Sequence, residues 1–511
     1  MTARGAGGIE VFARFRDLAT EGLPLPARLT SADPLPLVRL DQSSTIRFDS
    51  WRVWAVIIAV QLILLGIFVF DWRVPVVLAA GFVAVVVMLD RPVWSVAIML
   101  GARLIATTTT SFFTIGSISI GLFEPVLALA AGSLLLRAIF TQKTLWKNWP
   151  WKPLFIAHFI WMIIGLFGWS TKFSDGLKDV IPLVIIFATS TVIIAFVETW
   201  EEVKMMMWAW IGTCVAIGVI TFFGDALGLT DYASQWKAAE GGRSTGLGQQ
   251  PNWFAMNLMF VVHATAAFAL IQKRPILRWG LLFACLFIFF TMMTSGSRGG
   301  AYSIVIGGAI VSLGQPLFRR WFVGLGGGGL LMLAVGAATG LVDLGSGWNR
   351  IIENIDVLFV MDIRGMNWAA CMGMFTDTFG LGIGPGGYID QLAKYSWFIY
   401  ESVYRYPHGI FWGEMAHTGI VGIIMLFALV VVIGRMAWQT IQDTRGTEAE
   451  VLAWAMPSSM LGYFAWSFVE FSYEEKPFWE WLALFTALHL VARKAKTGEL
   501  PPIAEWKLSL A

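Results

Sequence analysis

The chain has 511 residues, of which 57% are hydrophobic and only 14% are charged. A soluble domain cannot bury so much apolar surface, so the composition excludes a soluble enzyme and predicts an all-α, polytopic membrane protein in a lipid bilayer. The net charge of +2 and the lack of a long basic block argue against a nucleic-acid partner, and three cysteines do not make a disulfide framework.

The predicted organisation is a single transmembrane domain between two cytoplasmic ends. Residues 1–52 are mixed and polar, with scattered prolines and no visible cleavable signal peptide, and residues 493–511 form a short tail. Between them, runs of about 20 apolar residues mark twelve to fourteen candidate spans. The candidates are residues 53–70, 75–89, 93–112, 121–140, 153–170, 180–197, 205–223, 252–272, 279–294, 299–314, 321–341, 409–434, 451–468 and 478–492.

Basic residues in the short loops predict the orientation, because such loops carry excess Lys and Arg on the cytoplasmic side. With the N-terminus inside and fourteen crossings, every basic loop is cytoplasmic, namely residues 143–152, 273–278, 319–320, 435–445 and 493–496. Three segments are then extracytoplasmic: residues 224–251, 295–298 and the long loop 342–407.

The long loop 342–407 is too large for a simple connector, and loops of this size usually carry function. Its apolar residues recur at helical spacing from Trp348 to Phe359, which predicts an amphipathic helix on the membrane surface. A second helical stretch, residues 364–378, ends at a glycine-rich turn, residues 380–387. We expect this loop to cap the external mouth of a cavity, where Trp348, Trp368 and Trp397 are candidates for stacking against sugar rings.

Arg298, Arg364 and His408 all fall on this external rim. Ionisable groups near membrane depth are costly, so a cluster on one side is a functional-site hypothesis. Each residue also has a simpler interpretation. Arg298 also fits an arginine at the membrane interface, Arg364 fits a solvated charge in a loop, and His408 fits a cap of the following helix.

Five further polar residues are candidate substrate ligands. Arg243 and Lys178 are further candidates for binding phosphate. Asn252, at the start of a span, is expected to be a helix cap first and a ligand second. Glu414 and His417 share one face of a helix, where they contact either each other or the substrate.

Arg103 and His263 are polar residues of a different kind, because each lies inside an apolar run. We expect them to pair with neighbouring spans.

An ordered set of motifs resembles the superfamily of O-antigen ligases, O-antigen polymerases and bacterial protein O-oligosaccharyltransferases. The motifs are Gly-Leu-Gly-Gln-Gln-Pro-Asn at 246–252, Thr-Ser-Gly-Ser-Arg at 294–298, Arg-Gly-Met-Asn-Trp at 364–368, Gly-Ile-Gly-Pro-Gly-Gly-Tyr at 382–388, and His408 with Gly419 and Gly422. The resemblance covers about residues 246 to 432. The family usually has Asn after the loop histidine, where this chain has Gly409. It commonly has Glu two residues before the first glycine of the pair, where this chain has His417, with Glu414 about one helical turn earlier.

The resemblance implies a GT-C-like glycosyltransferase of the bacterial inner membrane, with its active site on the periplasmic side. The implied donor is a glycan on polyprenyl (undecaprenyl) diphosphate, and the implied acceptor is a lipid or a glycan. By motif match, Arg298 and Arg364 contact the diphosphate, and His408 activates the acceptor hydroxyl.

The residue types suit this chemistry. Arginine binds phosphate oxygens bidentately and stays charged, and histidine titrates near neutrality. No Asp-x-Asp pair or His/Cys cluster appears in the external segments, which predicts a reaction without metal or cofactor. Three alternatives stay open: a repeat-unit polymerase of the same superfamily, a transporter of small anions such as bicarbonate, and a membrane scaffold.

Overall fold

The computed structural model describes residues 91–105, 113–115, 118–121, 123–141, 149–223, 250–327, 363–396, 406–470, 473 and 475–505. All of them belong to one compact unit, Gly81–Ala511. The predicted spans 53–70 and 75–89 and the predicted amphipathic helix from Trp348 to Phe359 lie outside the described residues.

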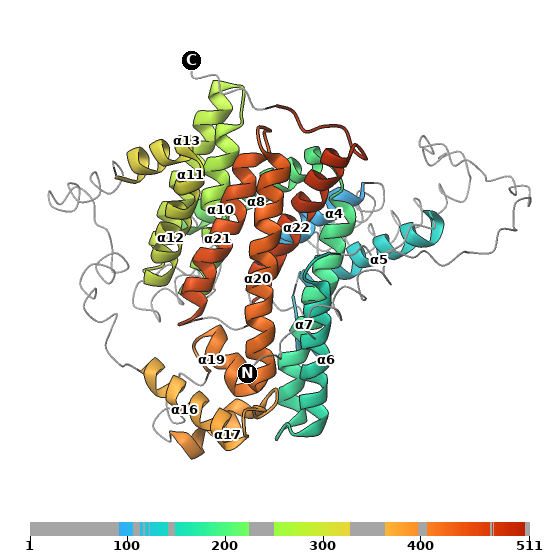
Figure 1. The fold of residues 1–511 in the computed structure, drawn as a ribbon, viewed down its shortest axis with the longest axis vertical. Helices are drawn as coiled ribbons and strands as arrows, with labels where there is room; N and C mark the ends of the chain where they lie inside the picture. The colour runs from blue at the N-terminus through green and yellow to red at the C-terminus, as the bar shows by residue number, and fades with distance from the viewer. Residues whose placement is uncertain are drawn as a thin grey trace, which may run out of the picture. The chain divides into compact units, whose positions relative to one another are not determined.

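The described part is a largely helical membrane protein (Figure 1). Five of its helices are long and apolar enough to cross a membrane: α7 (Phe173–Phe196), α8 (Trp200–Phe223), α10 (Pro251–Leu270), α11 (Pro275–Met293) and α20 (Gly419–Thr444). Shorter or less apolar helices accompany them: α4 (Pro92–Ile105), α5 (Phe123–Thr141), α6 (Lys152–Gly168), α12 (Arg298–Gly314), α13 (Pro316–Trp321), α21 (Glu450–Ser467) and α22 (Lys476–Thr497). Each except α13 coincides with part of a predicted span, within a few residues at most ends, whereas α13 lies in the predicted loop between the spans 299–314 and 321–341.

Helix α10 lies at the centre of the bundle. In the most apolar 18-residue window of α10, 89% of the residues are buried, whereas in that of α20 only 28% are buried. Helices α11, α12 and α21 pack against α10. Small residues allow this close approach: a side chain at Gly299 would overlap Trp466, and one at Gly307 would lie 2.6 Å from the His263 ring.

A short β-hairpin interrupts the helices and was not predicted. Strands β1 (Phe113–Ile115) and β2 (Ile118–Ile120) pair antiparallel, with Ile115 opposite Ile118. The sequence between them is Gly-Ser, which two-residue hairpin turns favour, and the strands are rich in β-branched residues. These residues lie between two predicted spans, where an apolar-run search finds only a connection.

The predicted span 409–434 is two helices rather than one. Helix α19 (Ile410–His417) ends at Thr418, and α20 begins at Gly419 with a left-handed φ of 65°. The glycine-rich turn, residues 380–387, docks into this break. Ile383 N–H donates to Ala416 O at 2.8 Å, Gly384 N–H to His417 O at 3.0 Å, and Ile420 N–H to Gly380 O at 2.8 Å.

The glycine-rich turn also joins the long loop to the bundle. It connects α16 (Ile363–Asp377) to α17 (Gly387–Tyr395), and both helices gather with α19 at one end of the bundle (Figure 1). Gly386 N–H donates to the Asp179 carboxylate at 2.6 Å, and Ser170 Oγ donates to Pro385 O at 2.7 Å. The helix predicted over 364–378 is therefore confirmed as α16, and the turn after it is held by α6 and α7.

Candidate active site

The centre of the site is the carboxylate of Glu470, which follows α21 and is only 6% exposed. Asn252 Nδ2 donates to Glu470 Oε1 at 2.7 Å, and Arg364 Nη2 donates to Glu470 Oε2 at 2.8 Å. His408 Nδ1 lies 3.9 Å from the same Oε2. Three of the predicted site residues therefore meet at one buried carboxylate.

Helix starts bring these side chains together. Asn252 is the second residue of α10, Arg364 is the second residue of α16, and His408 lies two residues before α19. The positive end of a helix dipole and a charge-assisted hydrogen bond both favour a carboxylate, so this environment offsets part of the cost of burying Glu470. The same features suit any other anion that reaches Arg364.

The backbone at His408 is held in a strained conformation. Its φ is 48°, which is uncommon for a residue with a side chain and is often found at functional sites. Trp368 Nε1 donates to His408 O at 2.9 Å, and the Tyr406 ring lies 3.9 Å from the imidazole, centroid to centroid. Trp368 thus holds the His408 backbone, and Tyr406 packs against the imidazole.

Gly409 departs from the family pattern for a steric reason. Its φ is 138°, and a Cβ built there would overlap Phe468 O. Only glycine suits this position, so the Asn of the family does not fit this backbone.

Arg298 lies at the same end of the bundle as Glu470. It is the first residue of α12, after the N-cap Ser297, whose side chain accepts from Gly300 N–H at 3.4 Å. Its neighbour Gly299 packs on Trp466, four residues before Glu470. The Arg298 side chain is half-buried.

Asn252 does not cap α10, contrary to the prediction. The N-cap is Gln250, whose side-chain oxygen accepts from Asn252 N–H at 2.8 Å and Trp253 N–H at 3.1 Å. Gln250 precedes Pro251 at the first helical position, so the cap falls one residue before the proline. The Asn252 side chain is directed instead to Glu470.

Glu414 and His417 belong to separate contacts and are not joined by a hydrogen bond or ion pair in the described part of the chain. Glu414 Oε2 lies 3.2 Å from His158 Nε2 and accepts from Thr418 Oγ1 at 2.6 Å. The His417 ring packs edge-on against Tyr388, with centroids 6.1 Å apart. The Glu414 contact links α19 to α6.

Two further candidates lie away from Glu470 or outside the described residues. Lys178 donates to Asp175 at 2.7 Å within the first turns of α7, and half of its side chain is exposed. Asp175 also accepts from Lys172 at 2.6 Å. Arg243 lies outside the described residues.

A second group of charges lies where α4, α5 and α22 meet. Arg103 Nε is 3.6 Å from Glu480 Oε1, and Lys476 Nζ is 3.6 Å from Glu124 Oε1. The prediction that Arg103 pairs with another helix is thus confirmed.

The same prediction holds for His263. Its Nδ1 lies 3.2 Å from Ser459 Oγ of α21, and its Nε2 lies 2.8 Å from Ile304 O of α12.

Glu475, just before α22, lies between the two groups of charges. Burial raises the pKa of its carboxyl to about 7, Arg103 opposes this rise, and the nearby Glu470 adds to it. This carboxyl therefore titrates close to neutral pH.

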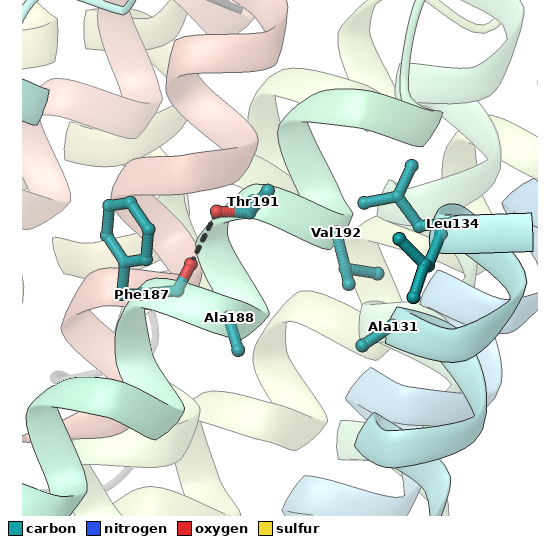
Figure 2. Close-up of a pocket in the computed structure, with 7 residues that line it drawn as sticks. Ala131, Leu134, Phe187, Ala188, Thr191 and Val192 are labelled. Atoms are coloured by element: carbon teal, nitrogen blue, oxygen red, sulfur yellow. Dashed lines mark hydrogen bonds between the residues drawn. The ribbon is translucent and has the colours of Figure 1, made fainter. Parts of the chain in front are cut away.

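An apolar pocket lies between α5 and α7 (Figure 2). It has a volume of about 200 Å³, and the only hydrogen bond drawn there joins Thr191 Oγ1 to Phe187 O within α7. Its lining residues are Ala131, Leu134, Leu135, Phe187, Ala188, Thr191 and Val192. None of them belongs to the group around Glu470, so the pocket suits a hydrocarbon chain rather than the polar chemistry.

Glu470 itself was missed by the sequence reasoning. It lies just beyond the predicted span 451–468, in Phe-Val-Glu-Phe, and the predicted topology puts it on the external rim. The rule that singled out Arg298 and Arg364, an ionisable group at a span end, applies equally to a carboxylate. No family model and no curated protein matches the chain.

Proposed function

We propose that this protein is a membrane glycosyltransferase that moves a glycan from a polyprenyl-diphosphate donor to an acceptor hydroxyl, in the manner of an O-antigen ligase. The observation that supports it is the meeting of Arg364, His408 and Asn252 at one buried carboxylate, with Arg298 at the same end of the bundle. These are the residue types that transfer from a lipid diphosphate requires.

In the proposed reaction, His408 takes the proton of the acceptor hydroxyl. The acceptor oxygen then bonds to the anomeric carbon as the bond from that carbon to the phosphate oxygen breaks. The bonding electron pair leaves with the diphosphate, whose growing charge Arg298 and Arg364 stabilise. A single displacement of this kind inverts the anomeric carbon.

Arg364 can stabilise the diphosphate while it keeps its hydrogen bond to Glu470. A guanidinium carries five N–H donors, so it can bind a carboxylate on one edge and a phosphate oxygen on another. About a third of the Arg364 side chain, 32%, is exposed, which leaves a surface for the donor.

The test is single replacement of Arg298, Arg364 and His408 by alanine in purified protein with a polyprenyl-diphosphate glycan donor. We expect each variant to lose about 10²–10³-fold in transfer rate, the usual effect of removing a base or a charge-stabilising group. Lys496→Ala in α22 is the matched control, because it removes an exposed cation from the same protein without touching the Glu470 group or any candidate substrate ligand. Folded alanine variants that transfer as fast as this control would discard the proposal. Excess chelator should leave the rate unchanged, and a loss that magnesium restores would refute metal independence.

The proposed orientation, with the site on the periplasmic face, has its own test. Lys394→Cys in α17 and Lys496→Cys in α22 each place a thiol at a position where more than half of the native side chain is exposed. A membrane-impermeant maleimide added outside intact cells should label the first and not the second. The reverse pattern would overturn the orientation.

A further inference from the structure

The Glu470 carboxylate lies beside both Arg364 and the proposed base His408. Its Oε2 accepts from Arg364 Nη2 at 2.8 Å and lies 3.9 Å from His408 Nδ1. A histidine that accepts a proton at one ring nitrogen needs its other nitrogen protonated and held, and a carboxylate is a common partner for this purpose.

We infer that Glu470 is a positioning residue for His408: its carboxylate accepts from the Nδ1–H group and leaves Nε2 as the base. This inference rests on the proposed function. It assigns a role to a residue outside the motifs that carry the family resemblance.

The carboxylate is fixed well enough for this role. Asn252 holds Oε1 and Arg364 holds Oε2, so the group cannot rotate away from the imidazole without breaking one of two strong hydrogen bonds. At 3.9 Å, Nδ1 is about 1 Å beyond hydrogen-bond distance. Catalytic hydrogen bonds are often long in ligand-free proteins and shorten when substrate binds. Tyr406 packs against the imidazole and keeps it beside Glu470. A shift of about 1 Å would bring Nδ1 into hydrogen-bond distance of Oε2.

The competing explanation is that Glu470 serves only as the counterion of Arg364. The two roles differ in how removal of charge affects His408. In the described part of the chain, the charged side chains placed near the imidazole are Glu470, Arg364 and, next to Glu470, Glu475. Loss of an adjacent negative charge lowers the pKa of an imidazole, so the base stays neutral, and active, to lower pH.

The test compares Glu470→Gln with Arg364→Lys and Asp377→Asn. In Glu470→Gln we expect transfer to fall at least tenfold and the acid limb of the pH–rate profile to move about one unit lower. Glu470→Asp should recover part of the rate. Arg364→Lys keeps its charge, so its acid limb should stay in place even though its rate falls. Asp377→Asn is the matched control, because it removes a cation-bound carboxylate from the other end of α16.

A second readout does not depend on glycan transfer. The chain has five histidines, so ring-labelled protein gives few imidazole signals, and His408→Gln identifies the one of interest. Its titration should move to lower pH in Glu470→Gln and stay in place in Asp377→Asn. If the wild type transfers no glycan, the proposed function fails while this titration still tests the contact. If the wild type is active and neither the acid limb nor the titration moves in Glu470→Gln, the inference is overturned.

Discussion

Replacing Gly419 by alanine should displace the glycine-rich turn from the break between α19 and α20. Gly419 has a φ of 65°, and a Cβ there would overlap the Gly380 carbonyl oxygen and lie 2.5 Å from the Leu381 carbonyl carbon. Both neighbours are backbone atoms, which cannot turn aside as a flexible side chain can. The glycine-rich turn must therefore move out of the break between α19 and α20.

The size of the effect follows from a comparison with Gly446. That glycine has a similar φ of 79°, yet nothing lies within 4 Å of a Cβ built on it. Gly446→Ala therefore costs only the left-handed backbone penalty, about 1–2 kcal/mol. Gly419→Ala adds overpacking of about 1–3 kcal/mol and the loss of one or two backbone hydrogen bonds at about 1 kcal/mol each. The difference between the two variants should be about 3 kcal/mol.

The assay is reversible unfolding in mixed micelles, followed by tryptophan fluorescence, with both variants in the same detergent. Proteolysis between α16 and α17 provides a local readout, which should accelerate in Gly419→Ala alone. Equal destabilisation of the two variants, with unchanged proteolysis, would show that the turn does not rest in the break as described.

Three further predictions concern single residues. Gly409→Asn, which restores the residue usual in the family, should abolish transfer and lower the Tm, because its Cβ would overlap Phe468 O; an active, stable variant would refute the steric argument. Gly434→Ala should stabilise the protein by about 1 kcal/mol, since this position inside α20 has nothing within 4 Å and alanine is the better helix former; a lower Tm would contradict this. The pKa of the Glu475 carboxyl is about 4.5 in the unfolded chain and about 7 in the folded protein. Its protonation therefore stabilises the fold fully below pH 4.5, and this stabilisation is lost as the pH rises through 7. Glu475→Gln should accordingly gain about 2–3 kcal/mol over the wild type between pH 5 and pH 8, and parallel stability curves would count against a buried, titrating carboxyl.

Apolar periodicity predicted the helices well because the membrane imposes one requirement on every span. Backbone polar groups in lipid must be satisfied within the segment, so a long apolar run has to be helical. The predicted spans 252–272 and 279–294 correspond to α10 and α11 within a few residues. The helix predicted over 364–378, which is not a span, corresponds to α16 and ends just before the glycine-rich turn.

Features that depend on contacts distant in sequence were not predictable in the same way. The break at Thr418 lies inside the predicted span 409–434, and the turn at residues 380–384 supplies donors to Ala416 O and His417 O there. Likewise, Glu414 and His417 share one helix, but their partners, His158 and Tyr388, come from other elements. Spacing alone predicts which residues share a face and does not identify what that face meets.

The glycines in the resembling motifs therefore say less about function than the charged residues do. Gly382 has a φ of 82°, and a Cβ there would lie 2.7 Å from Gly419 N; Gly422 has no room for a side chain beside Thr418 and Glu414. Docking of the loop explains Gly382, and packing within the α19–α20 break explains Gly422, whatever reaction the protein performs. Packing does not explain why an arginine, a histidine and an asparagine from three helix starts surround one carboxylate, because apolar residues of similar volume would fill that space at lower cost. The case for a transferase thus depends on the group around Glu470, and replacing those residues, rather than the glycines, is the experiment that can decide it.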